Sequence, residues 1–105
     1  MIDRRTPDRR SPPDQPPSVS EVTARVKETV ETRFTDIWVA GEISNLTRAS
    51  SGHIYLSLKD ESALLRAVIW RGAVTGLAIE PADGMAVVCH GRIEVYAPRG
   101  TYQLT

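Results

Sequence analysis

The sequence predicts an all-β domain with one N-terminal helix and a short helical insert, and two observations carry this prediction. After Asp36, apolar and polar residues alternate through several short segments, which is typical of half-buried strands. Before it, apolar residues recur every fourth position, which is typical of an amphipathic helix. Strands this short bury their apolar faces only when the sheet closes or a second layer covers it. We therefore expect a small barrel.

The composition leaves room for one domain. The chain has 105 residues, 41% of them hydrophobic, and 13 Lys and Arg balance 13 Asp and Glu. No apolar run approaches the roughly 20 residues of a membrane span, and no signal-peptide pattern opens the sequence. The lone Cys89 agrees with a reducing compartment, so we expect a cytoplasmic protein without membrane contact. The neutral net charge by itself gives nucleic-acid binding no support.

Residues 1–17 are predicted to form a disordered tail before a folded domain of residues 18–105. The tail holds five of the seven prolines and few side chains that could be buried. Such a segment cannot offset the conformational entropy that it would lose on folding.

A helix is expected directly after this tail. Ser18 and Glu21 form a capping-box pattern, in which each side chain satisfies a backbone donor of the other residue. Valines are mediocre helix formers because they branch at Cβ, so this helix should need packing against another element. Its apolar stripe consists of Val22, Val26, Val30 and Phe34.

Five strands are predicted from the alternation, at residues 37–44, 53–59, 64–70, 85–96 and 101–105. Residues 45–52 are predicted to be a loop, and residues 72–83 an irregular insert with a short helix that ends near Pro81. Gly91 indicates a bulge or a sharp bend within the long fourth strand. The fifth strand stops without closing polar residues, so we expect a C-terminal truncation within this strand.

Five strands with a helical insert after the third match the five-stranded OB-fold, a Greek-key barrel whose second and third strands bind oligonucleotides or oligosaccharides. In single-strand binders, bases stack on aromatic rings at about 1–3 kcal/mol each, while Lys and Arg follow the phosphates. The outer face of these strands should display His53, Tyr55, Ser57, Lys59, Arg66, Val68 and Trp70. The remaining candidate nucleic-acid-binding residues, several of them in or beside flanking loops, are Arg48, Arg71, Arg92, Tyr96 and Arg99.

Two other interpretations of this face remain open. Tyr is common on exposed strands because β-propensity favours it, so the face could be an ordinary solvated surface. It could also contact another protein.

No catalytic residue, metal or cofactor is expected in this chain. Asp60 and Glu61 are adjacent in a turn, where their side chains diverge. His53 has no nucleophile or orienting carboxylate in a suitable context. Cys89 should be a small core residue, and Cys89 with His90 lacks further metal ligands.

Several motifs resemble the N-terminal domain of the exodeoxyribonuclease VII large-subunit family. They lie, in order, at residues 18–21, 38–45, 51–60, 70–71 and 91–104, so the resemblance spans Val19 to Leu104. The chain departs from the family in its shorter length and its proline-rich tail.

The resemblance implies an OB-fold domain that binds single-stranded DNA inside a much longer exodeoxyribonuclease subunit. A catalytic domain absent from this chain would hydrolyse that DNA to oligonucleotides in DNA repair. The small subunit of the enzyme would be a partner through other parts of the full-length subunit. The alternative is an intersubunit or interdomain packing module with little nucleic-acid affinity of its own.

Overall fold

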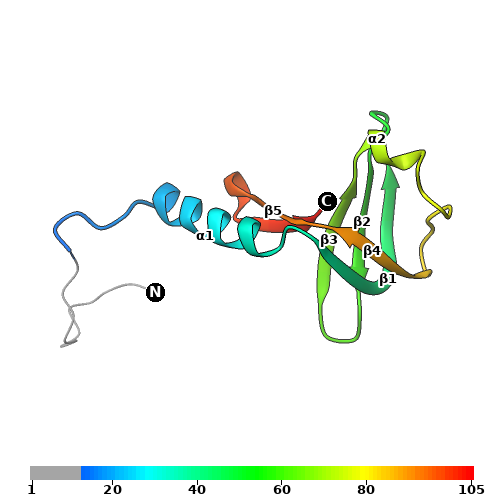
Figure 1. Cartoon of the computed structure of the whole chain (residues 1–105), viewed down its shortest axis with the longest axis horizontal. Helices are drawn as coiled ribbons and strands as arrows, with labels where there is room; N and C mark the ends of the chain where they lie inside the picture. Colours follow the sequence, from blue (N-terminus) through cyan, green and yellow to red (C-terminus); the bar gives the residue numbers. More distant parts are fainter. Residues whose placement is uncertain (1–12) are drawn as a thin grey trace.

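The computed structural model describes residues 13–105 and shows one curled β-sheet with a helix that extends to one side (Figure 1). The all-β class, the N-terminal helix and the helical insert are confirmed. Residues 1–12 of the predicted tail lie outside the described residues, and the domain boundary after residue 17 stays a prediction. The elements are α1 (Val19–Arg33), β1 (Ile37–Arg48), β2 (Ile54–Lys59), β3 (Leu64–Ile69), α2 (Arg71–Val74), β4 (Ala86–Gly91), β5 (Ile93–Tyr96), the 3-10 helix η1 (Ala97–Arg99) and β6 (Thr101–Leu104).

The predicted capping box begins α1. Ser18 Oγ accepts a hydrogen bond from the Glu21 N–H at 3.1 Å, and Glu21 Oε1 accepts one from the Ser18 N–H at 2.9 Å. Hydrogen bonding of the Glu21 carboxylate to the Ser18 N–H, and then to the Ser18 side chain, holds the pKa of Glu21 below its ordinary value of 4.5. Local sequence therefore determines where this helix begins.

The helix packs on β5 through two charged side chains. Lys27 Nζ donates to the Val95 carbonyl at 3.2 Å, and the Val95 N–H donates to Glu31 Oε2 at 2.9 Å. Because β5 is an edge strand, these bonds satisfy backbone groups that face no other strand. Lys27, and then the Val95 N–H, hold the pKa of Glu31 below its ordinary value of 4.5. No side chain of α1 is fully buried, and only Val30 of the predicted stripe packs against the core.

The first strand is longer than predicted. Residues 45–48, expected in a loop, continue β1 as far as Arg48. The pairing of β1 with β2 shifts between Ser44 and Thr47, and Asn45 takes a φ of 53°. A bulge therefore keeps these polar residues within the strand. Their polarity alone could not show whether they form a strand or a loop.

The predicted fourth strand is divided at Arg92 into β4 and β5, so the sheet has six strands where five were expected. The bend at Gly91 is confirmed, because a Cβ at this position would lie 2.1 Å from the carbonyl oxygen of Thr105. Only glycine lets the end of β6 pass so close. The bend allows one continuous segment to pair with β1 through β4 and with β6 through β5.

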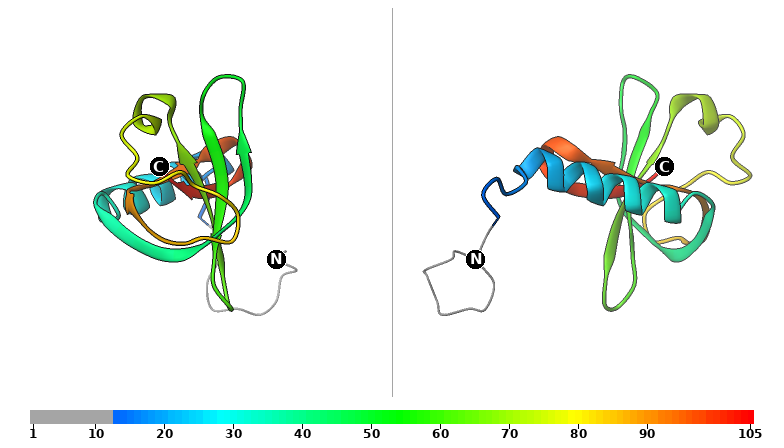
Figure 2. Two further views of the ribbon diagram at one scale, coloured as in Figure 1. Left: turned by 90° about the vertical axis from the view of Figure 1, so that its right-hand side faces the viewer. Right: turned by 60° about the vertical axis from the view of Figure 1, so that its left-hand side comes forward.

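The strand order is β4-β1-β2-β3-β6-β5, and only β3 and β6 are parallel, with Ala67 opposite Leu104. The edge strands β4 and β5 are consecutive in the chain, so the sheet curls round on itself (Figure 2). This is the expected OB-type barrel with its fourth strand in two pieces.

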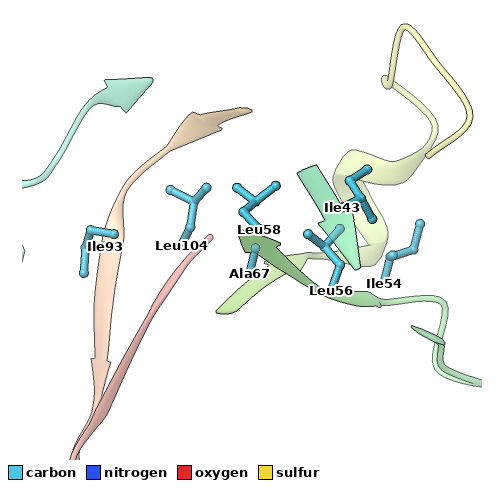
Figure 3. Packing of buried hydrophobic residues seen from close by; sticks show 7 residues of the cluster. All are labelled: Ile43, Ile54, Leu56, Leu58, Ala67, Ile93 and Leu104. Carbon is cyan, nitrogen blue, oxygen red and sulfur yellow. The ribbon is translucent and has the colours of Figure 1, made fainter. Parts of the chain in front are cut away.

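Inward-facing side chains of the strands form the core (Figure 3). They alternate along each strand with outward-facing residues, as the period of two requires. The predicted inward face of β2 is confirmed, since its three apolar residues all belong to this cluster. The cluster consists of Ile43, Ile54, Leu56, Leu58, Ala67, Ile93 and Leu104.

The insert between β3 and β4 is less helical than predicted. Its helix α2 ends at Val74, well before Pro81, and Gly72 and Gly76 weaken any longer helix. The insert is tied to the end of β1, where Asp83 Oδ1 accepts a hydrogen bond from the Leu46 N–H at 2.9 Å. A largely apolar cavity of about 600 Å³ lies between the insert and strands β3 and β4. Neither α-helix of residues 13–105 is long and apolar enough to cross a membrane.

Candidate nucleic-acid interface

The candidate surface is built on the antiparallel pair of β2 and β3. Tyr55 lies opposite Val68, and Ser57 lies opposite Arg66. Because alternate residues of a strand share one face, Tyr55, Ser57 and Lys59 point to the same side of β2, as predicted. The strand pairing thus brings an aromatic ring and two cations together on the outer side of the sheet.

Two residues predicted on this face are not displayed. Ser57 is 1% exposed and Val68 is 5% exposed, so their predicted exposure is wrong. β2 lies within the sheet between β1 and β3, and the longer Arg66 side chain extends over Ser57, with Nη1 3.5 Å from Ser57 Oγ. Ser57 is therefore no direct contact for a ligand but helps to position Arg66.

Among residues 13–105, the two cations of the face have no acidic partner. Lys59 and Arg66 are both exposed, and within residues 13–105 neither takes part in a salt bridge. Their charges are thus available for phosphate groups. Placement provides the positive surface that the neutral total charge did not predict.

Three aromatic rings form a cluster where β2 begins and β3 ends. The His53 and Trp70 rings lie 5.1 Å apart between centroids and nearly perpendicular at 85°. The His53 and Tyr55 rings lie 6.5 Å apart at 88°. Such edge-to-face contacts are favourable because they join the positive edge of one ring to the negative face of another. Trp70 remains 42% exposed, so this aromatic cluster (Tyr55, His53 and Trp70) offers a stacking surface to a base.

The cluster is attached to the start of α2. His53 Nδ1 accepts a hydrogen bond from the Arg71 N–H at 2.8 Å. The Arg71 side chain packs beside Gly52, and a Cβ on Gly52 would lie 2.9 Å from Cγ and Cδ of Arg71. Gly52 has a φ of 95°. The structure thus places Arg71 beside the predicted face, through the β1–β2 loop.

Four other predicted residues lie apart from this face. Arg48 is bound to Glu80 through Nη2 and Oε1 at 2.6 Å, and Arg92 is bound to Glu94 at 2.7 Å. Both guanidinium groups already have acidic partners. Tyr96 and Arg99 lie at the tip of the β5–β6 hairpin, which Figure 1 shows beside α1 and away from α2.

Strand β1 adds two residues to the outer face that were not among the predicted site residues. Thr47 lies opposite Tyr55, and Ser44 lies opposite Ser57, so both extend the outer face. Ser44 Oγ is buried and has no hydrogen-bond partner among the described residues. Ser44 lies within the predicted strand 37–44, whereas Thr47 falls in residues 45–52, which are predicted to be a loop. The apolar Leu46 within that polar stretch was the signal that the strand continues.

The groups with catalytic potential have structural explanations. Asp60 Oδ1 accepts hydrogen bonds from the N–H groups of Ser62 and Ala63 at 2.8 and 2.9 Å, which hold its pKa below 3.8. Asp60 therefore stabilises the β2–β3 turn. Burial raises the pKa of the Cys89 thiol above its ordinary 9.0, which makes it a poor nucleophile. Residues 13–105 contain no group of three or more potential metal ligands.

Residues 17–105 match a family of proteins described as an OB-fold nucleic acid binding domain. The chain is also similar to proteins named exodeoxyribonuclease 7 large subunit. The protein of Rhodopirellula baltica is 51% identical over 87 residues, which are 83% of this chain and 20% of that protein. The protein of Zymomonas mobilis is 52% identical over 83% of this chain and 16% of its own length. The protein of Geotalea daltonii is 47% identical over 83% of this chain and 20% of its own length.

The resemblance that the motifs indicated is therefore confirmed. The chain spans about a fifth of the length of these curated relatives, or less.

Proposed function

This chain belongs to the family of OB-fold nucleic acid binding domains, and we propose that it binds single-stranded DNA on the outer face of β2 and β3. One observation carries the proposal. The exposed Trp70 and its aromatic cluster lie at one end of the pair β2–β3, whose outer face also carries Lys59 and Arg66, two cations that form no ion pair among residues 13–105. Bases would stack on the rings, while Lys59 and Arg66 would contact phosphates.

The binding should be of moderate strength and sensitive to salt. Each neutralised phosphate of a single strand contributes a slope of about −0.7 to the plot of log K against log salt. Lys59 and Arg66 together should therefore produce a slope of about −1.4, and Arg71 would steepen it. A neutral chain without these local cations would show no such dependence.

Titration of a fluorescently labelled oligo-dT at two salt concentrations tests the proposal. The double variant Tyr55→Ala with Arg66→Ala should bind at least about tenfold more weakly, because it removes one stacking ring and one phosphate contact. The matched comparison is Tyr96→Ala with Arg99→Ala at the hairpin tip, which removes the same residue types. A loss there as large as on β2 and β3 would overturn the assigned face, and unchanged binding in both variants would overturn the proposal.

In a longer protein of the kind that its relatives represent, the domain would position single-stranded DNA for hydrolysis by another part of the polypeptide. This role would belong to an exodeoxyribonuclease acting in DNA repair in the cytoplasm, with the small subunit bound outside this domain. Incubation of the 105-residue chain with single-stranded DNA and Mg²⁺ should then yield no cleavage. Cleavage of single-stranded DNA by the purified chain would contradict the proposal that another part of the polypeptide hydrolyses the DNA.

A second candidate function is a packing module. Trp38 is 69% exposed and Val88 is 64% exposed on the outer face of β1 and β4, and exposed apolar groups of this size often mark interfaces. Light scattering would detect self-association through this face as a mass that rises with concentration. Trp38→Glu should then restore the monomer. Oligo-dT binding that was lost together with the association would favour packing as the main function.

A further inference from the structure

We propose that His53 is a positioning residue of the nucleic-acid surface, which holds Trp70 and Arg71 in place and does so only while its imidazole is neutral. Its effect on DNA rests on the proposed function above, whereas its effect on Trp70 does not. The proposal rests on two contacts of the His53 ring. It packs against the exposed Trp70 ring, and it accepts a hydrogen bond from the N–H of Arg71, the next residue in the chain.

The hydrogen bond determines the state of the ring. His53 Nδ1 accepts from the Arg71 N–H at 2.8 Å, and a ring nitrogen that accepts carries no proton of its own. In this bond the neutral ring therefore carries its hydrogen on Nε2. The Arg71 N–H opens α2 and has no carbonyl partner inside that helix, so His53 satisfies an otherwise unpaired donor. A proton on Nδ1 would place two donors against each other and break the contact.

Within residues 13–105, the neighbours of His53 provide no group that would stabilise a positively charged imidazole. Arg71 is a cation beside the ring, since its N–H binds His53 Nδ1 and its side chain packs against the preceding Gly52. Arg48 is a second cation at this end of the sheet, where it lies opposite Ile54 and is paired with Glu80. From β2 and β3 the ring meets the uncharged Tyr55 and Trp70. Across residues 13–105 no carboxylate forms an ion pair with His53. Protonation should therefore release Arg71, loosen the β1–β2 loop and reorient Trp70.

The sign of the pH effect separates a positioning residue from a direct contact. A histidine that touched phosphate would strengthen DNA binding when it gained a positive charge. His53 should do the opposite, because its protonation disturbs the stacking surface. Oligo-dT binding at constant ionic strength should therefore be about three- to tenfold weaker at about pH 5.5 than at about pH 8.

The two histidines of the chain provide the matched variants. His53→Gln retains an acceptor that does not titrate, so it should bind as well as the parent chain near pH 8 and lose the pH dependence. His53→Ala should bind weakly at both pH values. His90→Gln should retain the parent profile. Stronger binding in acid, or a pH dependence that follows His90 and not His53, would overturn the inference.

A measurement without DNA keeps this test separate from the proposed function. In a Trp38→Phe background, Trp70 is the only tryptophan and reports directly on its contact with His53. Its emission should shift between about pH 8 and pH 5.5, and His53→Gln should abolish the shift. Emission that did not change with pH would overturn the inference, whatever the DNA result. A shift without DNA binding at any pH would support it and contradict the proposed function.

Discussion

The two tryptophans of this chain each lie against one of its two histidines, and the two pairs are built differently. Trp70 meets His53 at 85° beside the β1–β2 loop, where His53 accepts a backbone N–H. Trp38 stacks on His90 at 5°, with centroids 4.1 Å apart, as cross-strand partners in β1 and β4. His90 Nε2 contacts Asp36 Oδ1, a contact that the neutral and the charged ring can both make.

The two pairs differ in their surrounding charge more than in their aromatic content, and this difference supports the proposal that Trp70 and not Trp38 contacts nucleic acid. One face of Trp38 is already occupied by His90, and the nearby Asp36 would repel phosphate. Trp70 instead has Arg71 as its chain neighbour and lies at the end of a face that carries Lys59 and Arg66. The same two residue types are thus expected to serve DNA binding in one pair and packing in the other.

The largest expected effect comes from removing each tryptophan in turn. Trp70→Ala should weaken oligo-dT binding about tenfold or more, since one stacked base contributes about 1–3 kcal/mol. Trp38→Ala should leave the affinity within about twofold. Fluorescence anisotropy of the labelled oligonucleotide measures both. Equal losses would remove the distinction between the pairs, and a larger loss for Trp38→Ala would move the binding site to β1 and β4.

A smaller effect on DNA binding is expected from substitution of the glycine that adjoins each histidine. Gly91→Ala would press a Cβ against the Thr105 carbonyl oxygen, so the free energy of unfolding should fall by about 1–3 kcal/mol. Gly52→Ala would strain a residue with a φ of 95° and displace the flexible Arg71 side chain, at a cost of about 1 kcal/mol.

Urea unfolding and oligo-dT titration together distinguish these two variants. Gly91→Ala should alter stability and leave the affinity of the folded fraction unchanged. Gly52→Ala should lower affinity as well, because it displaces Arg71 beside the aromatic cluster. An affinity loss in Gly91→Ala together with unchanged affinity in Gly52→Ala would contradict the contrast between the two regions.

The smallest effect should come from the contact between α1 and β5, which includes no residue of either pair. Lys27 and the Val95 N–H stabilise the ionised Glu31, whose folded pKa is therefore lowered from 4.5. A lowered carboxyl pKa stabilises the fold above the unfolded value, and that contribution disappears as the pH falls through the folded pKa. Glu31→Gln should thus lower the melting temperature near neutral pH, and the two melting curves should converge below pH 4.5. A difference that persisted in acid would exclude this electrostatic contribution.

Much of the fold could be predicted because its signals are local. The capping box at Ser18, the inward face of β2 and the bend at Gly91 each follow from neighbouring residues. The extent of β1 through residues 45–48 could not, because a bulge and cross-strand pairing decide whether polar residues stay in a strand. The contacts that tie the insert to β1 likewise join residues that are distant in the sequence.

The sequence by itself determined which residues share a face, because the period of a strand is a property of neighbouring residues. It therefore predicted Tyr55, Lys59 and Arg66 together on one surface. Only the tertiary structure decided which of the candidate residues already have partners, since these partners are distant in the chain. Arg48 meets Glu80 across 32 positions, and His53 meets Arg71 across 18. Burial of Ser57 between two neighbouring strands is likewise a result of packing, which alternation alone cannot show.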